Sequence, residues 1–266
     1  MRANIHPTAI VDSQARLATS VTVGAYSTIG PNVIIGEGCE IRSHVVIEGH
    51  TTLGEENVIF QFASIGSAPQ DLKYKGESST LEMGSRNIIR EHVTLNPGTQ
   101  GGHMRTVIGD DNVFLVGSHV AHDCSVGNNN ILSNGVALAG HVSIGNRIVL
   151  GGMVGVHQFC RIGDMAIAGA GSMLAHDLPP YCIGQGDRCH LRGVNIVGLR
   201  RGGVSEDEIL IIKKVYRHLF SKMGRLEEKI NNLPPELSGH LRIRPLIEFI
   251  QSSERTICTP LKHLSE

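Results

Sequence analysis

Four histidines and one carboxylate in the middle of the chain have the residue types that proton-transfer chemistry requires. They are His119, His122, His141 and His157, with Asp123 directly after His122. A histidine with an ordinary pKa of ~6.5 can remove the proton of a hydroxyl group and so activate it as a nucleophile. An adjacent carboxylate can fix the tautomer of that imidazole. The same side chains could instead hold a metal ion, since imidazole is the commonest metal ligand.

A repeat of six residues determines where these side chains lie. Apolar residues recur at every sixth position in three runs, from Ile5 to Ile65, from Met83 to Leu95 and from Ile108 to Leu174. A period of six fits neither an α-helix nor a plain alternating strand, and it indicates short strands joined by tight turns. The residue after the apolar one is often glycine, which is expected to permit a positive φ at the corner.

This hexad pattern resembles the hexapeptide-repeat acyltransferase superfamily, whose members are left-handed prisms with three hexads per coil. The resemblance, and not the periodicity, implies a coil of eighteen residues and its left hand. Residues eighteen apart would then be stacked roughly 4.8 Å apart. The predicted fold is mainly β, a left-handed parallel β-helix over residues 1–190, followed by a C-terminal α-helical domain over residues 191–266.

Stacking at this interval brings the histidines together. The hexads that begin at Val120, Leu138 and Val156 form one column. His122, His141, and His157 with Gln158 therefore lie along one edge of the prism, and His119 lies at the preceding corner. Gly140 stands directly above His122, where its backbone N–H could stabilise an oxyanion.

Two segments interrupt the repeat, at 66–82 and 97–106, and insertions in repeat proteins often lie on the binding face. A function is favoured for the first, which carries the polar set Gln70, Asp71, Lys73 and Tyr74. After Pro179 and Pro180 the hexads stop. A capping box at 205–208 opens an amphipathic helix that is expected to reach Met223, and the helices are expected to cover the open end of the prism.

The chain resembles the UDP-N-acetylglucosamine O-acyltransferase family, which catalyses the first step of lipid A biosynthesis. The QDLKY loop and the AHDC, GHV and HQF series are specific together, whereas a hexad alone would be weak. The segments that carry the resemblance are HVVIEGHT (44–51), FASIG (62–66), QDLKYKGE (70–77), AHDCSVGN (121–128), LAGHV (138–142), GGMVGVHQFCRIG (151–163), DLPPY (177–181) and GVNIVGLRR (193–201).

The resemblance implies transfer of an (R)-3-hydroxyacyl chain from acyl-carrier protein to the 3-position of UDP-N-acetylglucosamine or of its 3-amino analogue. It implies a homotrimer with sites between neighbouring prisms, phosphopantetheine on the carrier as the acyl handle, and neither a metal nor another cofactor. His122 matches the general base, Asp123 its acidic neighbour and Gly140 the oxyanion donor. The positions that match substrate contacts are Gln70, Asp71, Lys73, His119, His141, His157, Gln158, Asn195 and Arg201.

Two sets of positions bear on substrate selection. Ala170 matches the position that limits acyl-chain length in the family, with Met173 as the alternative stop, and a medium chain is expected. Arg188, Val197 and Gly202 depart from the residues of a well-known member, which puts the nucleotide contacts in doubt. Acyl-carrier proteins are acidic, and basic residues that could dock the donor lie between residues 188 and 222: Arg188, Arg192, Arg200, Arg201, Lys213, Lys214, Arg217 and Lys222.

Composition narrows the possible partners and location. A formal net charge of -1 provides no global field for nucleic acid or an anionic membrane. Residues 1–11 contain no basic stretch followed by an apolar run, so no signal peptide is expected, and no apolar window approaches the length of a membrane span. The six cysteines contain no CxxC pair and are expected to be reduced thiols of a cytoplasmic protein.

Three alternatives remain. A γ-class carbonic-anhydrase-like zinc protein would use the histidines as ligands, but the QDLK loop would then have no obvious role. The related glucosamine N-acyltransferase usually carries an extra N-terminal uridine-binding domain, for which hexads beginning at Ile5 are expected to leave no room. A non-enzymatic hexapeptide scaffold would not need the histidine edge.

Overall fold

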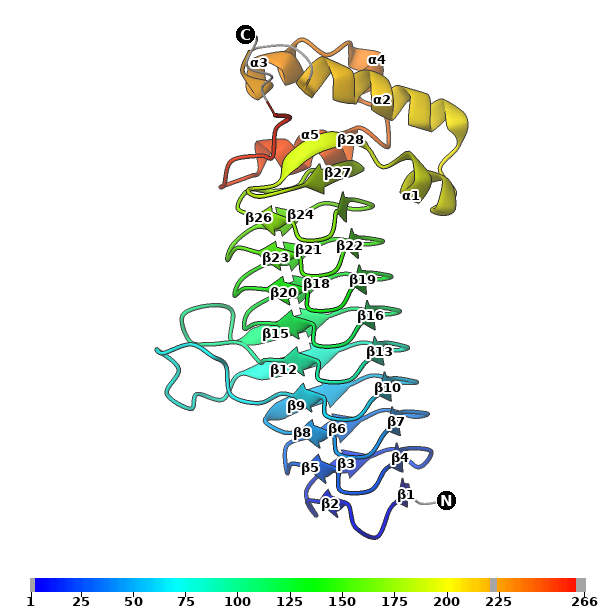
Figure 1. Cartoon of the computed structure of the whole chain (residues 1–266), viewed down its shortest axis with the longest axis vertical. Coiled ribbons are helices and arrows are strands. Elements are labelled where there is room, and N and C mark those ends of the chain that lie inside the picture. The colour runs from blue at the N-terminus through cyan, green and yellow to red at the C-terminus, as the bar shows by residue number, and fades with distance from the viewer. Residues whose placement is uncertain (1–2, 221–223, 262–266) are drawn as a thin grey trace.

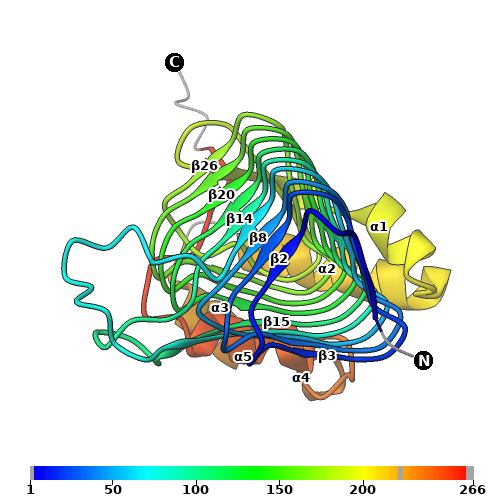
Figure 2. The ribbon, with the colours of Figure 1, turned by 90° about the horizontal axis from the view of Figure 1, so that it is seen from below.

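The computed structural model describes residues 3–220 and 224–261 of the 266-residue chain. The chain forms a triangular prism of three parallel sheets with helices at its C-terminal end (Figures 1 and 2). Most hexads supply a strand of two residues, of which the first points outward and the second into the prism, as at β5 (Thr28–Ile29), β6 (Ile34–Ile35) and β8 (Val46–Ile47). The predicted left-handed parallel β-helix is confirmed.

As far as β26, each of the three sheets takes every third strand of the chain, and β27 and β28 then extend the first sheet. The first sheet contains β1 (Asn4–Ile5), β4 (Thr22–Val23), β7 (Glu40–Ile41), β10 (Val58–Ile59), β13 (Ile88–Ile89), β16 (Val113–Phe114), β19 (Ile131–Leu132), β22 (Val149–Leu150), β25 (Ile167–Ala168), β27 (Cys182–Gln185) and β28 (His190–Val194). The second contains β2 (Ile10–Val11), β5 (Thr28–Ile29), β8 (Val46–Ile47), β11 (Ser64–Ile65), β14 (Thr94–Leu95), β17 (His119–Val120), β20 (Ala137–Leu138), β23 (Gly155–Val156) and β26 (Met173–Leu174). The third contains β3 (Arg16–Leu17), β6 (Ile34–Ile35), β9 (His50–Leu53), β12 (Thr80–Met83), β15 (Arg105–Ile108), β18 (Ser125–Val126), β21 (Ser143–Ile144) and β24 (Arg161–Ile162).

Most glycines of the hexad have a different role from the expected one, although Gly66 has the expected positive φ, at +80°. Gly24 and Gly54 do not have positive φ; the left-handed corner positions lie two residues later, at Tyr26 and Glu56. A Cβ at Gly24 would lie 2.7 Å from the carbonyl carbon of Arg42 in the next coil. Glycine is therefore required here because consecutive coils approach closely, and not because of its backbone freedom.

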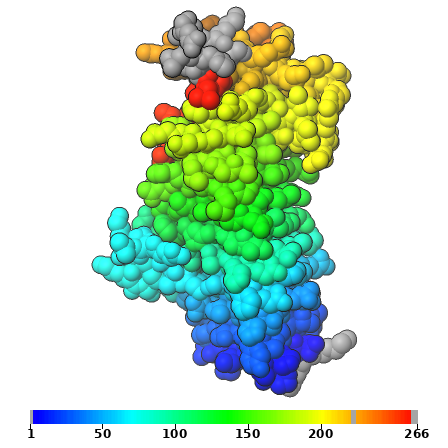
Figure 3. Space-filling view, viewed as in Figure 1, coloured from blue at the N-terminus to red at the C-terminus, as the bar shows by residue number. Residues whose placement is uncertain are grey.

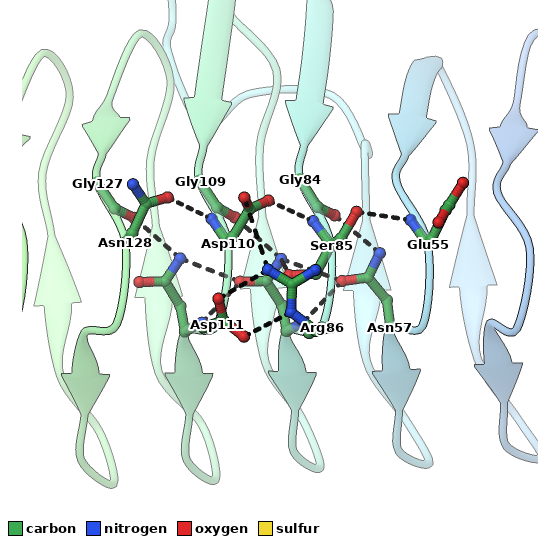
Figure 4. A network of polar contacts seen from close by, with 12 residues as sticks. Glu55, Asn57, Gly84, Ser85, Arg86, Gly109, Asp110, Asp111, Gly127 and Asn128 are labelled. Atoms are coloured by element: carbon green, nitrogen blue, oxygen red, sulfur yellow. Dashed lines mark hydrogen bonds and ion pairs between the residues drawn. The ribbon is translucent and has the colours of Figure 1, made fainter.

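A ladder of buried asparagines runs along the corner between the third and first sheets (Figure 4). Asn57, Asn87, Asn112 and Asn130 are fully buried, and each Oδ1 accepts the backbone N–H of the equivalent residue in the next coil at 2.9 Å. Each Nδ2 donates to a glycine carbonyl of the next coil at 2.9–3.0 Å. The ladder satisfies buried backbone groups that tight corners would otherwise leave without partners.

The same ladder continues past both insertions. Val58 pairs with Ile88 and Ile88 with Val113, at separations of 30 and 25 residues instead of 18. The insertions thus add twelve and seven residues to their coils. Both leave the prism at the corner between the second and third sheets, where Figure 3 shows the longer one as a protrusion.

In the part of the chain that the structure describes, the hairpin of β27 and β28 and five helices follow the last coil. The helices are α1 (Ile196–Arg201), α2 (Glu206–Phe220), α3 (Leu226–Asn231), α4 (Pro235–Ser238) and α5 (Arg244–Gln251). The predicted capping box at the start of α2 is confirmed, with reciprocal hydrogen bonds between Ser205 and Glu208. Met223 and Lys222 lie outside the described residues. The proposed domain boundary between residues 190 and 191 lies within β28, and the division into two domains stays a prediction.

The segment after α5 returns to the prism. The guanidinium of Arg255 donates to the carbonyls of Gln158 and Ala175, and Cys258 donates its N–H to Asp177. Within residues 3–220 and 224–261, no helix is long and apolar enough to cross a membrane.

We expect Asn112→Ala to destabilise the protein by about 2–4 kcal/mol, because it leaves several buried partners without hydrogen bonds. Asn128→Ala, at an exposed position of the neighbouring ladder in Figure 4, is the matched control and should cost much less. Urea unfolding measures both. Equal losses would show that the buried ladder contributes little to stability.

Candidate active site

A groove of about 880 Å³ runs along the outer face of the second sheet. Strand pairing places His119, Ala137, Gly155 and Met173 one above another on this face. The floor between His119 and Met173 therefore consists of very small residues. The groove is lined by Gln70, His119, Ala121, His122, Ala137, Leu138, Ala139, Gly140, Gly155, Val156, His157, Met173, Leu174, Ala175, His176, Asp187, Arg188 and Arg255.

His122 and Asp123 form a hydrogen-bonded pair at the lower end of the groove. The distance from His122 Nδ1 to Asp123 Oδ2 is 2.9 Å, and the side-chain exposures are 15% and 0%. Burial alone would raise the pKa of Asp123, but hydrogen bonds from Thr99, His122 and His103 outweigh it and hold the pKa below its usual value. An ionised carboxylate only accepts hydrogen bonds, so the imidazole carries its proton on Nδ1 and Nε2 is left with a lone pair.

Gly140 lies directly above the imidazole of His122, as the eighteen-residue stacking predicts. A Cβ at Gly140 would lie 2.5–3.1 Å from three atoms of the His122 ring, so any other residue would displace it. Within the described part of the chain, the N–H of Gly140 donates to no protein acceptor. This backbone N–H is therefore available to a ligand in the groove.

The remaining histidines surround the pair. The Nδ1 of His119 is 2.7 Å from the hydroxyl of Thr94, and burial lowers the pKa of His119. His141 meets His122 edge-on at 5.0 Å between ring centroids and stacks on Phe159 at 4.4 Å. Burial also lowers the pKa of His141. These two imidazoles are favoured in their neutral form, in which they can both donate and accept hydrogen bonds.

Three residues of the first insertion were predicted to contact the substrate, and one of them lies in the groove. Gln70 lines the groove, whereas Asp71 and Lys73 lie outside its lining, with the Asp71 carboxylate accepting the N–H of Lys73. Asp71 is close enough to His141 to oppose slightly the lowering of its pKa. His157 also lines the groove, and Gln158 is exposed beside it.

Other predicted residues lie apart from this groove. Asn195 is the N-cap of α1, where its Oδ1 accepts from Gly198 and its Nδ2 donates to the carbonyl of Met165. Arg201 is exposed at the end of the same helix. In Figure 2, α1 lies on the opposite side of the prism from the first insertion. Val197 and Gly202 belong to this region, whereas Arg188 lines the upper end of the groove.

The two positions proposed for chain-length selection are placed differently. Met173 is half exposed and lines the groove above Gly155. Ala170 is exposed and is not part of the groove lining. Within one chain, Met173 is therefore the side chain that can obstruct the groove.

A metal ion would fit poorly at the histidine edge. His122, Asp123 and His141 have ligand atoms within 4.8 Å of one another. The carboxylate of Asp123, however, already accepts hydrogen bonds from Thr99 N, Thr99 Oγ1, His103 N and His122 Nδ1. These donors occupy the lone pairs that a metal would need. The donor set thus suits a proton-transfer pair better than a zinc centre.

The contribution of the second insertion was not predicted. Three of the four donors on Asp123 come from residues 99–103 of that loop. Its glycines indicate tight turns, but no spacing in the sequence shows that the loop folds back on a residue 24 positions later. His176, Asp187 and Arg255, at the upper end of the groove, were also missed.

Comparison with known proteins shows which family this chain resembles. A family model described as UDP-N-acetylglucosamine O-acyltransferase, domain 2, matches residues 177–258, and one for bacterial transferase hexapeptide repeats matches residues 15–49. The chain is 50% identical over 253 residues to an acyl-[acyl-carrier-protein]–UDP-N-acetylglucosamine O-acyltransferase of Myxococcus xanthus, which covers 95% of this chain and 98% of that protein.

Solved structures agree with this assignment. The UDP-N-acetylglucosamine O-acyltransferase of Moraxella catarrhalis superposes with a TM-score of 0.92 at 42% identity, covering 95% of this chain and 98% of that one. The acyltransferase of Arabidopsis gives a TM-score of 0.85 at 34% identity, covering 96% and 100%. The chain therefore belongs to the UDP-N-acetylglucosamine O-acyltransferase family.

Proposed function

We propose that the protein transfers an (R)-3-hydroxyacyl chain from acyl-carrier protein to the 3-position of UDP-N-acetylglucosamine, or of its 3-amino analogue, in lipid A biosynthesis. The observation that carries the proposal is the His122–Asp123 pair beneath Gly140 in a groove with a small-residue floor. The identity of the chain's relatives supports the same reaction.

The groove supplies the groups that acyl transfer needs. Nε2 of His122 takes the proton of the sugar 3-hydroxyl while the hydroxyl oxygen attacks the thioester carbon. The N–H of Gly140 then donates to the oxyanion that forms. When the intermediate collapses, the carbon–sulfur bond breaks and the carrier's phosphopantetheine thiolate takes the proton back from His122. The ionised Asp123 stabilises the imidazolium between these steps.

The small-residue floor suits an acyl chain. Three coil steps separate His119 from Met173, which is about 14 Å at ~4.8 Å per step. Ala137 and Gly155 leave room above the sheet between these two residues. A medium hydroxyacyl chain that starts at His122 can lie over them and end against Met173.

One chain holds only part of the expected site. Asn195 and Arg201 are on the other side of the prism from the groove, and Leu72 at the tip of the first insertion is fully exposed. A neighbouring chain that brought its α1 against the groove would complete the site and cover this leucine. Repeating this heterologous contact closes a ring, which we propose is a homotrimer.

The donor protein is acidic, and basic residues near the open end could attract it. Arg188 lies at the upper end of the groove, and Lys213 and Lys214 lie on α2. Long-range attraction of this kind raises association rates and weakens with salt. We place the reaction in the cytoplasm, without a metal or other cofactor.

His122→Ala should reduce turnover by roughly 10²–10⁴-fold while the protein stays folded, because general bases typically contribute that much. The assay supplies hydroxyacyl carrier proteins with either UDP-N-acetylglucosamine or its 3-amino analogue and identifies the products by mass. His6→Ala, an exposed histidine in the first coils, is the control. Near-normal turnover of folded His122→Ala would contradict the proposed mechanism.

Met173→Ala should shift the donor preference toward longer chains by roughly tenfold in kcat/KM, because pocket contacts of this size discriminate by ~1–3 kcal/mol. Ala170→Gly should change it less, since Ala170 could reach the chain only from a neighbouring subunit. Competition between carrier proteins with different chains measures both. A larger shift for Ala170→Gly would make Ala170 the stop.

Shared sites predict complementation between inactive variants. Trimers assembled from His122→Ala and Arg201→Ala chains contain one junction with both native residues, so the mixture should regain activity that neither variant has alone. A mixture of His122→Ala and Asp123→Ala is the control and should stay inactive, since both changes lie on the same side of the junction. Absence of rescue in the first mixture would contradict a site shared between His122 of one chain and Arg201 of its neighbour.

A further inference from the structure

Thr99 and the loop around it hold the carboxylate of Asp123. The Thr99 hydroxyl donates to Asp123 Oδ2 at 2.7 Å, the same oxygen that is 2.9 Å from His122 Nδ1. We propose that Thr99 is a positioning residue, which acts through Asp123 to orient His122 as a base. This inference rests on the proposed acyl transfer. The hydrogen bonds from which it is argued are seen in the structure whatever reaction the protein catalyses.

The carboxylate sits in a closed polar cage. The N–H of Thr99 points between both oxygens, at 3.2 and 3.1 Å, and the N–H of His103 donates to Oδ1 at 2.8 Å. The side chain of Asp123 has no exposed surface, and Thr99 is 2% exposed. Charge-assisted hydrogen bonds inside a buried site are stronger than neutral ones at the surface.

The second insertion folds into a tight turn that holds the carboxylate of Asp123. The carbonyl of Thr99 accepts from both Gly102 and Met104, which closes the loop into a tight turn. A Cβ at Gly102 would lie 2.3–2.5 Å from the carboxylate atoms of Asp123, so only glycine leaves room for the carboxylate. The N–H of Gln100 donates to Glu77, which ties the loop to the first insertion.

The shared oxygen explains how Thr99 can affect the base. A carboxylate held by His122 and two backbone groups alone could rotate about its last bond, and the imidazole would follow it. Loss of the hydroxyl also removes a hydrogen bond to the charged form, which raises the pKa of Asp123. Rotation of the carboxylate reduces the fraction of enzyme in which His122 is correctly oriented, whereas the raised pKa of Asp123 is a separate readout of the lost hydrogen bond.

The test uses near-isosteric substitutions in the full-length protein. Thr99→Val should lower kcat by roughly tenfold with little change in KM, because fewer molecules hold His122 in the orientation that the transition state needs. Thr99→Ser keeps the hydroxyl and should restore the rate. Thr106→Val is the control, because Thr106 is also buried but its hydroxyl has no partner.

A double-mutant comparison separates positioning from general damage. If Thr99 acts through Asp123, Thr99→Val should have almost no additional effect on kcat in an Asp123→Ala background. Additive losses, or a tenfold loss of kcat that Thr99→Ser does not rescue, would overturn the proposal and leave Thr99 with a structural role only.

A readout without activity distinguishes failure of this inference from failure of the proposed function. With ¹³C-labelled aspartate, the carboxyl resonance of Asp123 should titrate at higher pH in Thr99→Val than in wild type, and should be unchanged in Thr106→Val. If the titration shifts but the protein transfers no acyl chain, the proposed function is refuted and the coupling between Thr99 and Asp123 is still supported. An unshifted titration would refute the coupling.

Discussion

The stacking of each residue on the residue one coil later is the constraint on which the rest of the structure depends. Parallel pairing such as Val120 to Leu138 and Leu138 to Val156 repeats along all three sides of the prism. A side chain is therefore fixed by the coil below and the coil above it. Close approach at Gly24 and the hydrogen bonds of the Asn57 ladder follow from this spacing. Both insertions lie at a corner that does not carry the ladder.

The candidate active site lies at the corner where the regular repeat is interrupted. Both insertions leave the prism at the corner that carries His122 and Asp123, and neither shifts the register of the strands that follow. The stack supplies what repetition can supply, namely a row of histidines, a glycine above His122 and a floor of small residues. The second insertion supplies what repetition cannot, because its Thr99 and His103 reach Asp123 from a direction that no hexad side chain can take.

The predictable part of the molecule is the part that repeats. Apolar spacing, together with the family's eighteen-residue coil, predicted that Gly140 lies over His122 and that His141 lies beside them, and the structure agrees. The reason expected for the hexad glycines was wrong for most of them, since periodicity shows that a small residue is needed but does not show which contact requires it. The contacts of Thr99 and Arg255 could not be predicted, because a loop and a terminal segment that fold back onto the prism have no period to follow.

The cage around Asp123 also bears on the choice between the two chemistries that the histidines allow. A buried carboxylate without partners would tend to take up a proton, and it could then no longer fix the imidazole tautomer. Four donors reverse this tendency and keep the pKa of Asp123 low. The same donors fill the lone pairs that would coordinate zinc. An arrangement that keeps this carboxylate ionised without exposing it to solvent therefore favours proton transfer by His122 and disfavours a metal centre at the same position.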